Sequence, residues 1–322
     1  MHTINRSAKI AAAFTAITCS AFMFSATANA QVPCGAFSSG RGQCINANLT
    51  VGSTSYNVDW YLPNAQASAL MILQHGFFRG CGNLRNTSKA IMEKDVMVLC
   101  LNADMSGGNS DLGNELGDLL TKRNITPPAG KLLPVNYIVG GHSAGGHFAS
   151  VVGKRLVERG YPNLKGAILF DPVASGGFSD NLYALSQGGN AEVLVIAARP
   201  ALANLSNNAF GALKSLPNRY VGLQLAWSHY IWGIWPTGKS CHTDVEGENG
   251  DLIGNVASGC SPNSTQVSRL RDFSSNWASD LGTGNRTSAY YCDNSSGHVN
   301  CGRKVTELVG GSLPKATLIP TH

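Results

Sequence analysis

The sequence contains few charged residues. Only 13% of its 322 residues are Asp, Glu, Lys or Arg, whereas about 25% is typical of soluble proteins. No block of Lys and Arg appears and the formal net charge is +5, so the chain lacks the basic surface of a nucleic-acid-binding protein. The cysteines do not show the paired spacing of a zinc finger. We therefore expect neither nucleic acid nor a metal ion as a partner.

Long apolar runs are also absent beyond the N-terminal segment. In that segment Arg6 and Lys9 precede an apolar stretch from Ile10 to about Phe24, and Ala28-Asn29-Ala30 follows. This order is typical of a secretory signal peptide with small residues at its cleavage site. A membrane anchor is the alternative, but the apolar stretch is short and is interrupted by Thr and Ser. We predict that residues 1–30 are a signal peptide and that the mature chain is secreted or periplasmic, with no membrane span.

The cysteines indicate disulfide bonds. Removal of Cys19 with the signal peptide leaves an even number, which in an exported chain favours disulfides over free buried thiols. The sequence does not fix the connectivity. The neighbouring pairs are Cys34/Cys44, Cys81/Cys100, Cys241/Cys260 and Cys292/Cys301. We expect Cys292–Cys301 first, because it closes a short loop, and we also predict Cys241–Cys260.

Apolar runs alternate with helical patterns along most of the chain. The runs predict strands at Tyr56–Leu62, Ala69–Gln74, Val96–Asn102, Val135–Val139, Gly166–Phe170, Val193–Ala197 and Tyr220–Ala226. The helical patterns cover Asp111–Lys122, Ala144–Glu158, Asn207–Leu216 and Ser264–Ser279. This alternation predicts an α/β fold with a mostly parallel sheet and helices on both faces. We expect one catalytic domain, 31–281, and an irregular, disulfide-stapled C-terminal extension, 282–322.

A candidate nucleophile lies between a predicted strand and a predicted helix. The segment Gly141-His142-Ser143-Ala144-Gly145 has the pattern G-x-S-x-G, and its strand–turn–helix setting is that of a nucleophile elbow. The tight turn leaves no room for side chains at the two glycines, and the helix N-terminus favours developing negative charge. We predict that Ser143 is the nucleophile. A glycine-rich turn without catalytic function is the alternative.

The general base is expected to be a histidine that follows the nucleophile in the chain. An elbow of this kind is completed in the chain order Ser, acid, His, which leaves His229, His242 and His298. We favour His242, which lies in a polar loop between the last predicted strand and the last predicted helix. His229 is the main rival because it follows a strand more directly.

The acid is expected between these two residues. Asp171 directly follows the strand Gly166–Phe170, at the strand end where sites of α/β proteins form, and a carboxylate there can orient an imidazole. Asp180 remains an alternative in a polar loop. Glu158 lies late in a helix and Glu192 starts a strand, so both are disfavoured. Asp171 could also only cap the turn that follows it.

The loop after an earlier strand carries the remaining predicted groups. His75-Gly76-Phe77-Phe78 follows Ala69–Gln74, and the backbone N–H groups of Phe77 and Ala144 are the predicted oxyanion hole. Gly76 allows the loop to approach closely. The predicted substrate-binding residues are aromatic side chains expected near the site, although ordinary packing is an alternative for each. They are Phe78, Trp227 and Trp232.

These segments resemble the α/β-hydrolase superfamily. The elbow Gly141–Gly146 and the spacing of the site residues look most similar to those of its chlorophyllase-like and cutinase-like polyester hydrolase branches. The resemblance covers about Val51–Leu281. In these relatives the acid follows the next strand, as in Asp171-Pro172, and the His comes about a hundred residues after the Ser. The resemblance implies two-step acyl transfer through an acyl-enzyme, with no cofactor and no metal.

The expected function is that of a secreted, monomeric serine carboxylic-ester hydrolase of class EC 3.1.1.-, acting on lipid or polyester substrates. Other functions use the same scaffold. A binding protein could retain the fold without catalysis, and a peptidase or an acyltransferase could use the same triad. Covalent labelling by a phosphonate would separate an enzyme from a binding protein.

Overall fold

The computed structural model describes residue 34 and residues 37–217, 220–247, 252–293 and 300–319. The predicted signal peptide, 1–30, lies outside the described residues. Within them, no helix is long and apolar enough to cross a membrane.

The apolar runs of the sequence form the centre of one ten-stranded sheet. Its strand order is β1-β2-β3-β5-β4-β6-β7-β8-β9-β14. The neighbours from β5 to β9 are parallel, and the other neighbours are antiparallel. The strands are β1 (Ser38–Ser39), β2 (Gly42–Val51), β3 (Thr54–Pro63), β4 (Leu70–Gln74), β5 (Met97–Leu101), β6 (Tyr137–His142), β7 (Leu164–Phe170), β8 (Glu192–Ala197), β9 (Gly222–Leu225) and β14 (Ala316–Ile319). The predicted mostly parallel sheet is confirmed.

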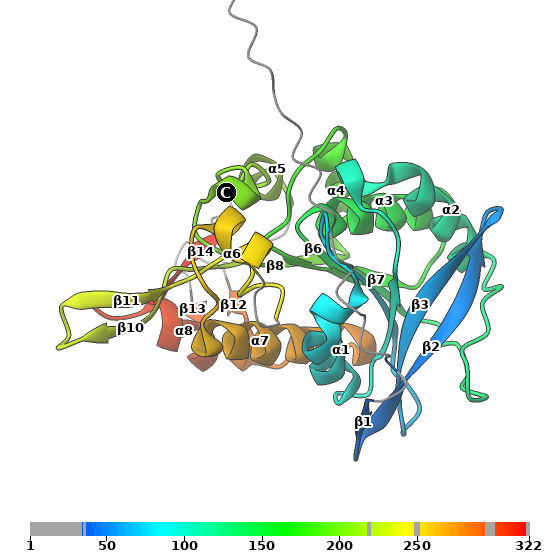
Figure 1. Cartoon of the computed structure of the whole chain (residues 1–322), viewed down its shortest axis with the longest axis horizontal. Coiled ribbons are helices and arrows are strands. Elements are labelled where there is room, and N and C mark those ends of the chain that lie inside the picture. Colours follow the sequence, from blue (N-terminus) through cyan, green and yellow to red (C-terminus); the bar gives the residue numbers. More distant parts are fainter. Residues whose placement is uncertain (1–33, 35–36, 218–219, 248–251, 294–299, 320–322) are drawn as a thin grey trace, which may run out of the picture. The chain divides into compact units, whose positions relative to one another are not determined.

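Helices cover both faces of this sheet (Figure 1). They are α1 (Arg85–Met92), α2 (Ser110–Thr121), α3 (Ala144–Glu158), α4 (Phe178–Leu185), α5 (Phe210–Lys214), α6 (Leu252–Ser258), α7 (Ser264–Thr283) and α8 (Arg303–Val309). In β4, Leu70 and Ile72 join the core under α2–α5, while Met71 and Leu73 join the core with α1, α7 and α8. Alternate side chains of one strand therefore pack on opposite layers.

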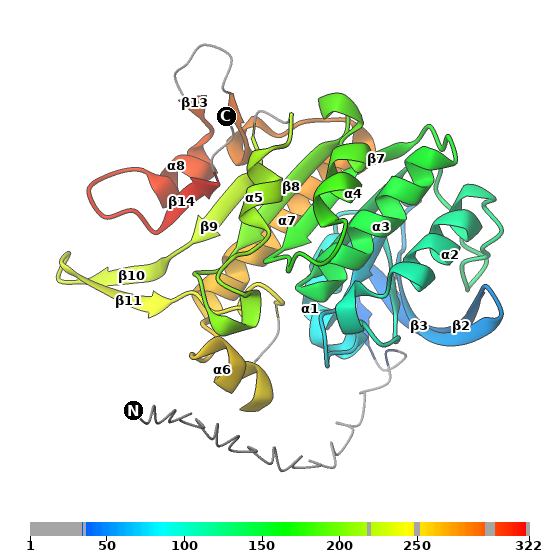
Figure 2. The same cartoon turned by 90° about the horizontal axis from the view of Figure 1, so that it is seen from above.

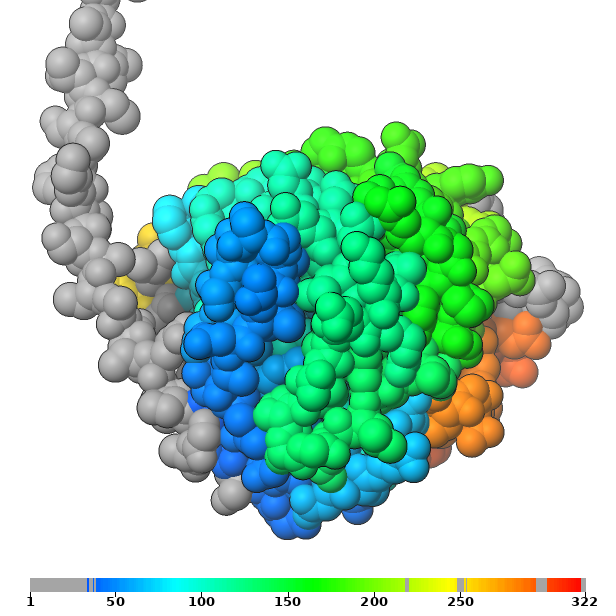
Figure 3. Space-filling model, turned by 90° about the vertical axis from the view of Figure 1, so that its right-hand side faces the viewer, coloured from blue at the N-terminus to red at the C-terminus, as the bar shows by residue number. Residues whose placement is uncertain are grey.

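The β2–β3 hairpin lies at one edge of the sheet beside α2, and its surface forms much of the face in Figure 3. At its turn, Gly52 has φ 60°, and a Cβ there would meet the Glu115 carboxylate of α2. This edge lies on the opposite side of the sheet from β9 and β14.

The C-terminal segment is more regular than the sequence predicts. The strands β12 (Cys292–Asp293) and β13 (Asn300–Cys301) pair as expected for a stapled hairpin, but α8 and β14 follow. Strand β14 lies antiparallel to β9 and extends the main sheet (Figure 2). The prediction of an irregular extension is therefore wrong for these elements, because apolar residues of 316–319 find a sheet edge to pair with.

Four disulfides connect neighbours in the sequence. They are Cys34–Cys44, Cys81–Cys100, Cys241–Cys260 and Cys292–Cys301. Both disulfides that the sequence analysis predicts by name are present. Two of the four lie in segments that lead into the candidate site, after β4 and after β11 (Trp235–Lys239).

Candidate active site

Ser143 occupies a sharp turn between β6 and α3. Its backbone angles are φ 56° and ψ −123°, a conformation that non-glycine residues rarely adopt and that is typical of functional sites. A Cβ at Gly141 would collide with the Gly145 carbonyl oxygen, and a Cβ at Gly145 would collide with that of Gln74. The elbow therefore requires glycine at both flanking positions of the G-x-S-x-G pattern.

Asp171 and His242 form a direct hydrogen bond. Asp171 follows the last residue of β7, and its Oδ2 lies 2.7 Å from Nδ1 of His242. Both side chains are buried, so the interaction is shielded from water and salt. Because Nδ1 is hydrogen-bonded to the carboxylate, Nε2 is the ring nitrogen available to exchange a proton with another group. The structure thus joins the predicted acid and the predicted base.

Two asparagines that the sequence analysis did not identify hold the Asp171 carboxylate. Asn204 donates from Nδ2 to Oδ2 at 2.9 Å, and Asn207 donates to Oδ1 at 3.1 Å. Both lie in the loop after β8. Together with His242, they give the buried carboxylate three side-chain donors, which satisfies its charge. An Asn-rich loop is too common a feature to predict this role.

The base loop, residues 240–247, is fixed at several points. Cys241 is joined to Cys260, and Asp244 accepts a hydrogen bond from the Cys241 backbone N–H at 2.6 Å. Asp244 also accepts from the backbone N–H of Asn263, which caps α7. Burial raises the pKa of Asp244 to about 6. The predicted disulfide thus anchors the loop that carries His242.

The loop after β4 passes close to Ser143. A Cβ at Gly76 would lie 2.9 Å from Cβ of Ser143, and the N–H of Arg79 closes the turn by donating to the Gly76 carbonyl at 3.3 Å. Phe77 follows Gly76, so its N–H belongs to the same close approach. Ala144 is the first residue of α3, and its backbone N–H therefore has no acceptor within the helix. The assignment of both N–H groups to an oxyanion hole stays a prediction.

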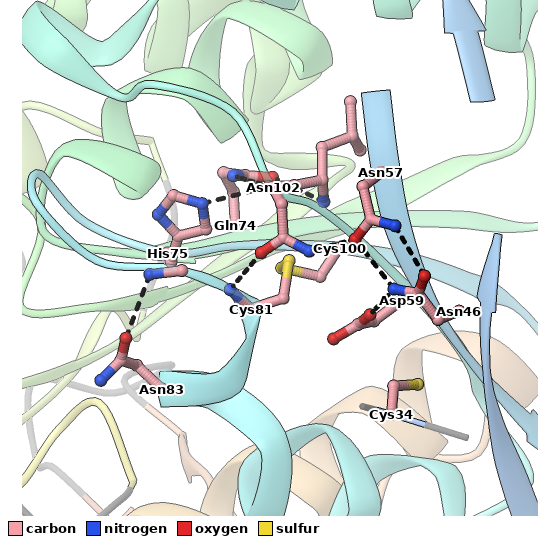
Figure 4. The surroundings of a disulfide bond; sticks show 12 residues. Cys34, Asn46, Asn57, Asp59, Gln74, His75, Cys81, Asn83, Cys100 and Asn102 are labelled. Carbon is pink, nitrogen blue, oxygen red and sulfur yellow. Dashed lines mark hydrogen bonds between the residues drawn. A yellow bond between two sulfur atoms is a disulfide. The ribbon is translucent and has the colours of Figure 1, made fainter. Parts of the chain in front are cut away.

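His75 braces this loop against β5. Its Nδ1 lies 2.9 Å from the Gly76 carbonyl oxygen and its Nε2 lies 3.1 Å from that of Leu101. Burial lowers its pKa, so the ring is neutral and donates to only one of the two. The nearby Cys81–Cys100 disulfide and the hydrogen bond from Cys81 N to Asn102 Oδ1 fix the end of the loop (Figure 4).

Ser143 and His242 line one pocket of about 180 Å³, together with Phe77 and Phe78. The aromatic residues Trp227 and Trp232 do not line it. They lie on the hairpin of β10 (Trp227–Ile231) and β11, and Trp232 is 88% exposed. The expectation that these two tryptophans line the pocket is therefore not supported, because the hairpin carries them away from the sheet.

The alternatives for base and acid lie elsewhere. His229 is exposed on β10, and Asp180 is exposed in the first turn of α4. Glu192 pairs with Arg286. His298 lies outside the described residues. Among the residues that the structure describes, no three His, Cys, Asp or Glu side chains are grouped as metal ligands would be.

The strand order and the elbow give the chain an α/β-hydrolase fold. No family model and no curated protein sequence matches it. Similar solved structures include a dienelactone hydrolase from Anabaena variabilis ATCC 29413, with 16% identity and a TM-score of 0.44 over 58% of this chain and 88% of that chain. Carboxyl esterase 2 from the mycorrhizal fungus Tuber melanosporum has 17% identity and a TM-score of 0.44 over 58% and 76%. An ester hydrolase from the metagenome of Lake Arreo, solved with a bipyridine phosphonate derivative, has 13% identity and a TM-score of 0.48 over 75% and 83%.

Proposed function

We propose that this protein is a secreted serine hydrolase of carboxylic esters, with Ser143, His242 and Asp171 as its catalytic triad. One observation carries the proposal. Ser143 sits in a strained elbow, and it shares a pocket with a histidine whose other ring nitrogen is held by a buried carboxylate. Nucleophile, base and orienting acid are the three groups that acyl transfer requires.

The reaction proceeds in two steps. Ser143 Oγ attacks the ester carbonyl carbon while Nε2 of His242 takes the hydroxyl proton, and the C–O bond to the alcohol breaks as His242 returns that proton to the leaving oxygen. Water, activated by the same nitrogen, then attacks the acyl-enzyme and releases the acid and free Ser143. Asp171 keeps the ring in the tautomer that presents Nε2 and stabilises the imidazolium.

The N–H groups of Ala144 and Phe77 stabilise the negative oxygen of each tetrahedral intermediate. Ala144 stands at the N-terminus of α3, where the helix dipole also favours negative charge. Each donor of this kind contributes about 3 kcal/mol to the stability of the transition state. Because these donors are backbone groups of a braced turn, they need little rearrangement during the reaction.

The pocket favours an ester with a short acyl unit. Its volume of about 180 Å³ is below the roughly 300–1,000 Å³ of pockets that enclose a drug-sized ligand. The rest of a larger substrate therefore lies outside, where large apolar side chains are exposed on segments that line or flank the pocket. They are Phe77, Phe78, Leu202, Leu205, Leu252 and Val256. An apolar polyester of short repeating units fits both features better than a long-chain lipid.

The proposal of secretion rests on the N-terminal sequence and on the disulfides. Four disulfides are typical of proteins that fold in an oxidising compartment. The cytosol keeps such thiols reduced, so folding outside it agrees with a cleaved signal peptide at residues 1–30.

The test is hydrolysis of p-nitrophenyl esters from acetate to palmitate by the mature protein and by Ser143→Ala. We expect a short-chain optimum in the wild type and loss of activity in the variant. A folded wild type that cleaves no ester and does not react with a phosphonate would contradict a serine hydrolase. Release of soluble acids from a polyester film, but not from long-chain triglyceride, would support the substrate proposal. The reverse would contradict it.

A further inference from the structure

A buried ion pair lies beside the candidate triad, and neither partner belongs to it. The Arg79 guanidinium contacts the Glu246 carboxylate through Nη2 to Oε2 at 2.6 Å and through Nε to Oε1 at 3.0 Å. The two side chains are only 9% and 2% exposed. Removing two charges from water is costly, and a bidentate geometry of this quality is needed to offset that cost. Such a pair inside a pocket wall calls for a functional explanation.

The ion pair joins the two loops that carry the proposed catalytic groups. Arg79 ends the turn that begins at Gly76 and contains the proposed donor Phe77. Glu246 belongs to the base loop, 240–247, which carries His242. A movement of one loop relative to the other would have to break the pair, so the ion pair restrains the distance between the proposed oxyanion donor and the proposed base.

His142 lies between the ion pair and the base. Its Nε2 lies 3.0 Å from the His242 carbonyl oxygen, its Nδ1 lies 3.6 Å from Glu246 Oε1, and its ring centroid lies 4.4 Å from that of His242. Burial holds the pKa of His142 well below its usual range, so the ring is neutral. Its single N–H is assigned to Nε2, where it can donate to the carbonyl of His242. Nδ1 then carries a lone pair and forms no hydrogen bond to a described residue, so His142 contacts the ion pair by packing alone.

We propose that Arg79 and Glu246 are positioning residues, whose direct ion pair ties the base loop, 240–247, to the loop Gly76–Arg79 and so holds His242 and the Phe77 N–H in register. This inference rests on the proposed esterase function. Because the pair is neutral as a whole, it supplies rigidity without adding net charge beside a base that must become an imidazolium. Among the described residues, the charged and titratable groups placed next to the His242 ring are Asp171, which follows β7, and His142 from β6. Behind His142 lie the ion pair and His75, which follows β4.

The experiment compares Glu246→Gln, Arg79→Met and the double variant. In each single variant we expect kcat for p-nitrophenyl acetate to fall about 10- to 100-fold, with KM within about threefold, because the reacting groups lose alignment. The acid limb of the pH–rate profile should shift in opposite directions in the two single variants. Glu246→Gln leaves a cation that disfavours the imidazolium, so its limb moves to lower pH. Arg79→Met leaves an anion that favours the imidazolium, so its limb moves to higher pH. Shifts of about half a pH unit or more are expected.

The double variant and two controls separate the loss of loop alignment from the change in charge near His242. Arg79→Met with Glu246→Gln restores neutrality, so its acid limb should return to that of the wild type while kcat stays low. Arg155→Met breaks the ion pair with Asp118 between α3 and α2 and should leave both kcat and the limb unchanged. Arg79→Lys keeps the positive charge but loses the bidentate contact of the guanidinium, and it should give an intermediate kcat. Limbs that stay fixed in folded single variants, or a wild-type kcat in the double variant, would overturn the proposal.

An NMR titration of the histidine ring protons gives a readout that does not depend on ester hydrolysis. The signal assigned to His242 by its loss in His242→Asn should titrate at lower pH in Glu246→Gln and at higher pH in Arg79→Met. An inactive wild type in which these titrations move as expected would contradict the esterase and leave the positioning network standing. An active wild type in which neither titration moves would contradict the network alone.

Discussion

Gly76 and Ser143 approach each other so closely that a Cβ on Gly76 would lie 2.9 Å from Cβ of Ser143. Real Cβ atoms do not tolerate such a contact, and the same added Cβ would lie 3.3 Å from His142 Nδ1. The loop after β4 and the turn at Ser143 are almost seventy residues apart in the chain, and they can approach this closely only because position 76 has no side chain. This contact sets the space in which the ester carbonyl would sit.

The first prediction concerns that contact. We expect Gly76→Ala to lower kcat about 10- to 100-fold, because the loop must retreat and carry the Phe77 N–H, the proposed oxyanion donor, away from the reacting carbonyl. The measurement is kcat and KM for p-nitrophenyl acetate. Gly82→Ala is the matched control, since a Cβ at Gly82 meets no atom within 4 Å. Equal kcat values for the two variants would show that the close approach does not matter for catalysis.

The second prediction concerns the support of Asp171. We expect Asn204→Ala to lower kcat about tenfold, because the carboxylate loses one of its three side-chain donors and holds the imidazole less firmly. The control is Asn190→Ala, whose side chain bonds only a nearby carbonyl at the surface. Thermal unfolding of both variants accompanies the kinetics. A loss of stability in Asn204→Ala with kcat unchanged would assign this residue to the fold alone.

The third prediction concerns the disulfide of the base loop. Replacing Cys241 and Cys260 by Ala should lower the free energy of unfolding by about 3 kcal/mol and also lower kcat, because the loop that carries His242 gains freedom. Replacing Cys292 and Cys301 should lower stability while kcat is retained, since that pair lies on the β12–β13 hairpin. The two double variants are compared by denaturant unfolding and by ester hydrolysis. Equal effects on kcat would contradict the local role of the first disulfide.

The fourth prediction concerns pH and Asp244. Burial raises its pKa from 3.8 to about 6, so the folded state binds this proton more tightly than the unfolded state does. The resulting stability is fully present below about pH 4 and is lost as the pH rises through 6; it amounts to at most about 3 kcal/mol. In Asp244→Asn this pH dependence should be absent. Melting temperatures between pH 4 and 7.5 measure the difference, and parallel curves for the two proteins would contradict the shift.

The elements with strong local signals could be predicted from the sequence. The helix α3 has the predicted bounds, Ala144–Glu158, because a glycine-rich turn starts it and its apolar positions repeat at helical spacing. The central strands were also predicted to within a few residues, since both of their faces are buried and their sequences are continuous apolar runs. The candidate triad was chosen by combining these elements with the chain order Ser, acid, His that such elbows use.

Features that depend on distant partners could not be predicted. Strand β14 pairs with β9, which lies about ninety residues earlier in the chain. The four residues of β14 carry no sequence signal that identifies β9 as their partner. The support of Asp171 by Asn204 and Asn207 arises only when two loops meet. Trp227 and Trp232 do not line the pocket for a related reason, because the sequence near a site does not give the direction in which a hairpin leaves the sheet. Their role in substrate binding stays a prediction.

The position of β14 has a consequence for the order in which the protein can be completed. A chain is made from its N-terminus, so every proposed catalytic residue has been synthesised before Ala316–Ile319 appear. Until then β9 presents an open row of backbone donors and acceptors, the kind of edge that recruits strands from other chains. A product that stops after α7 would contain the whole proposed triad, with β9 in place of β14 as the open edge of the sheet. This end of the sheet is therefore completed only after every proposed catalytic residue has been made, and β14 then replaces β9 as its outermost strand.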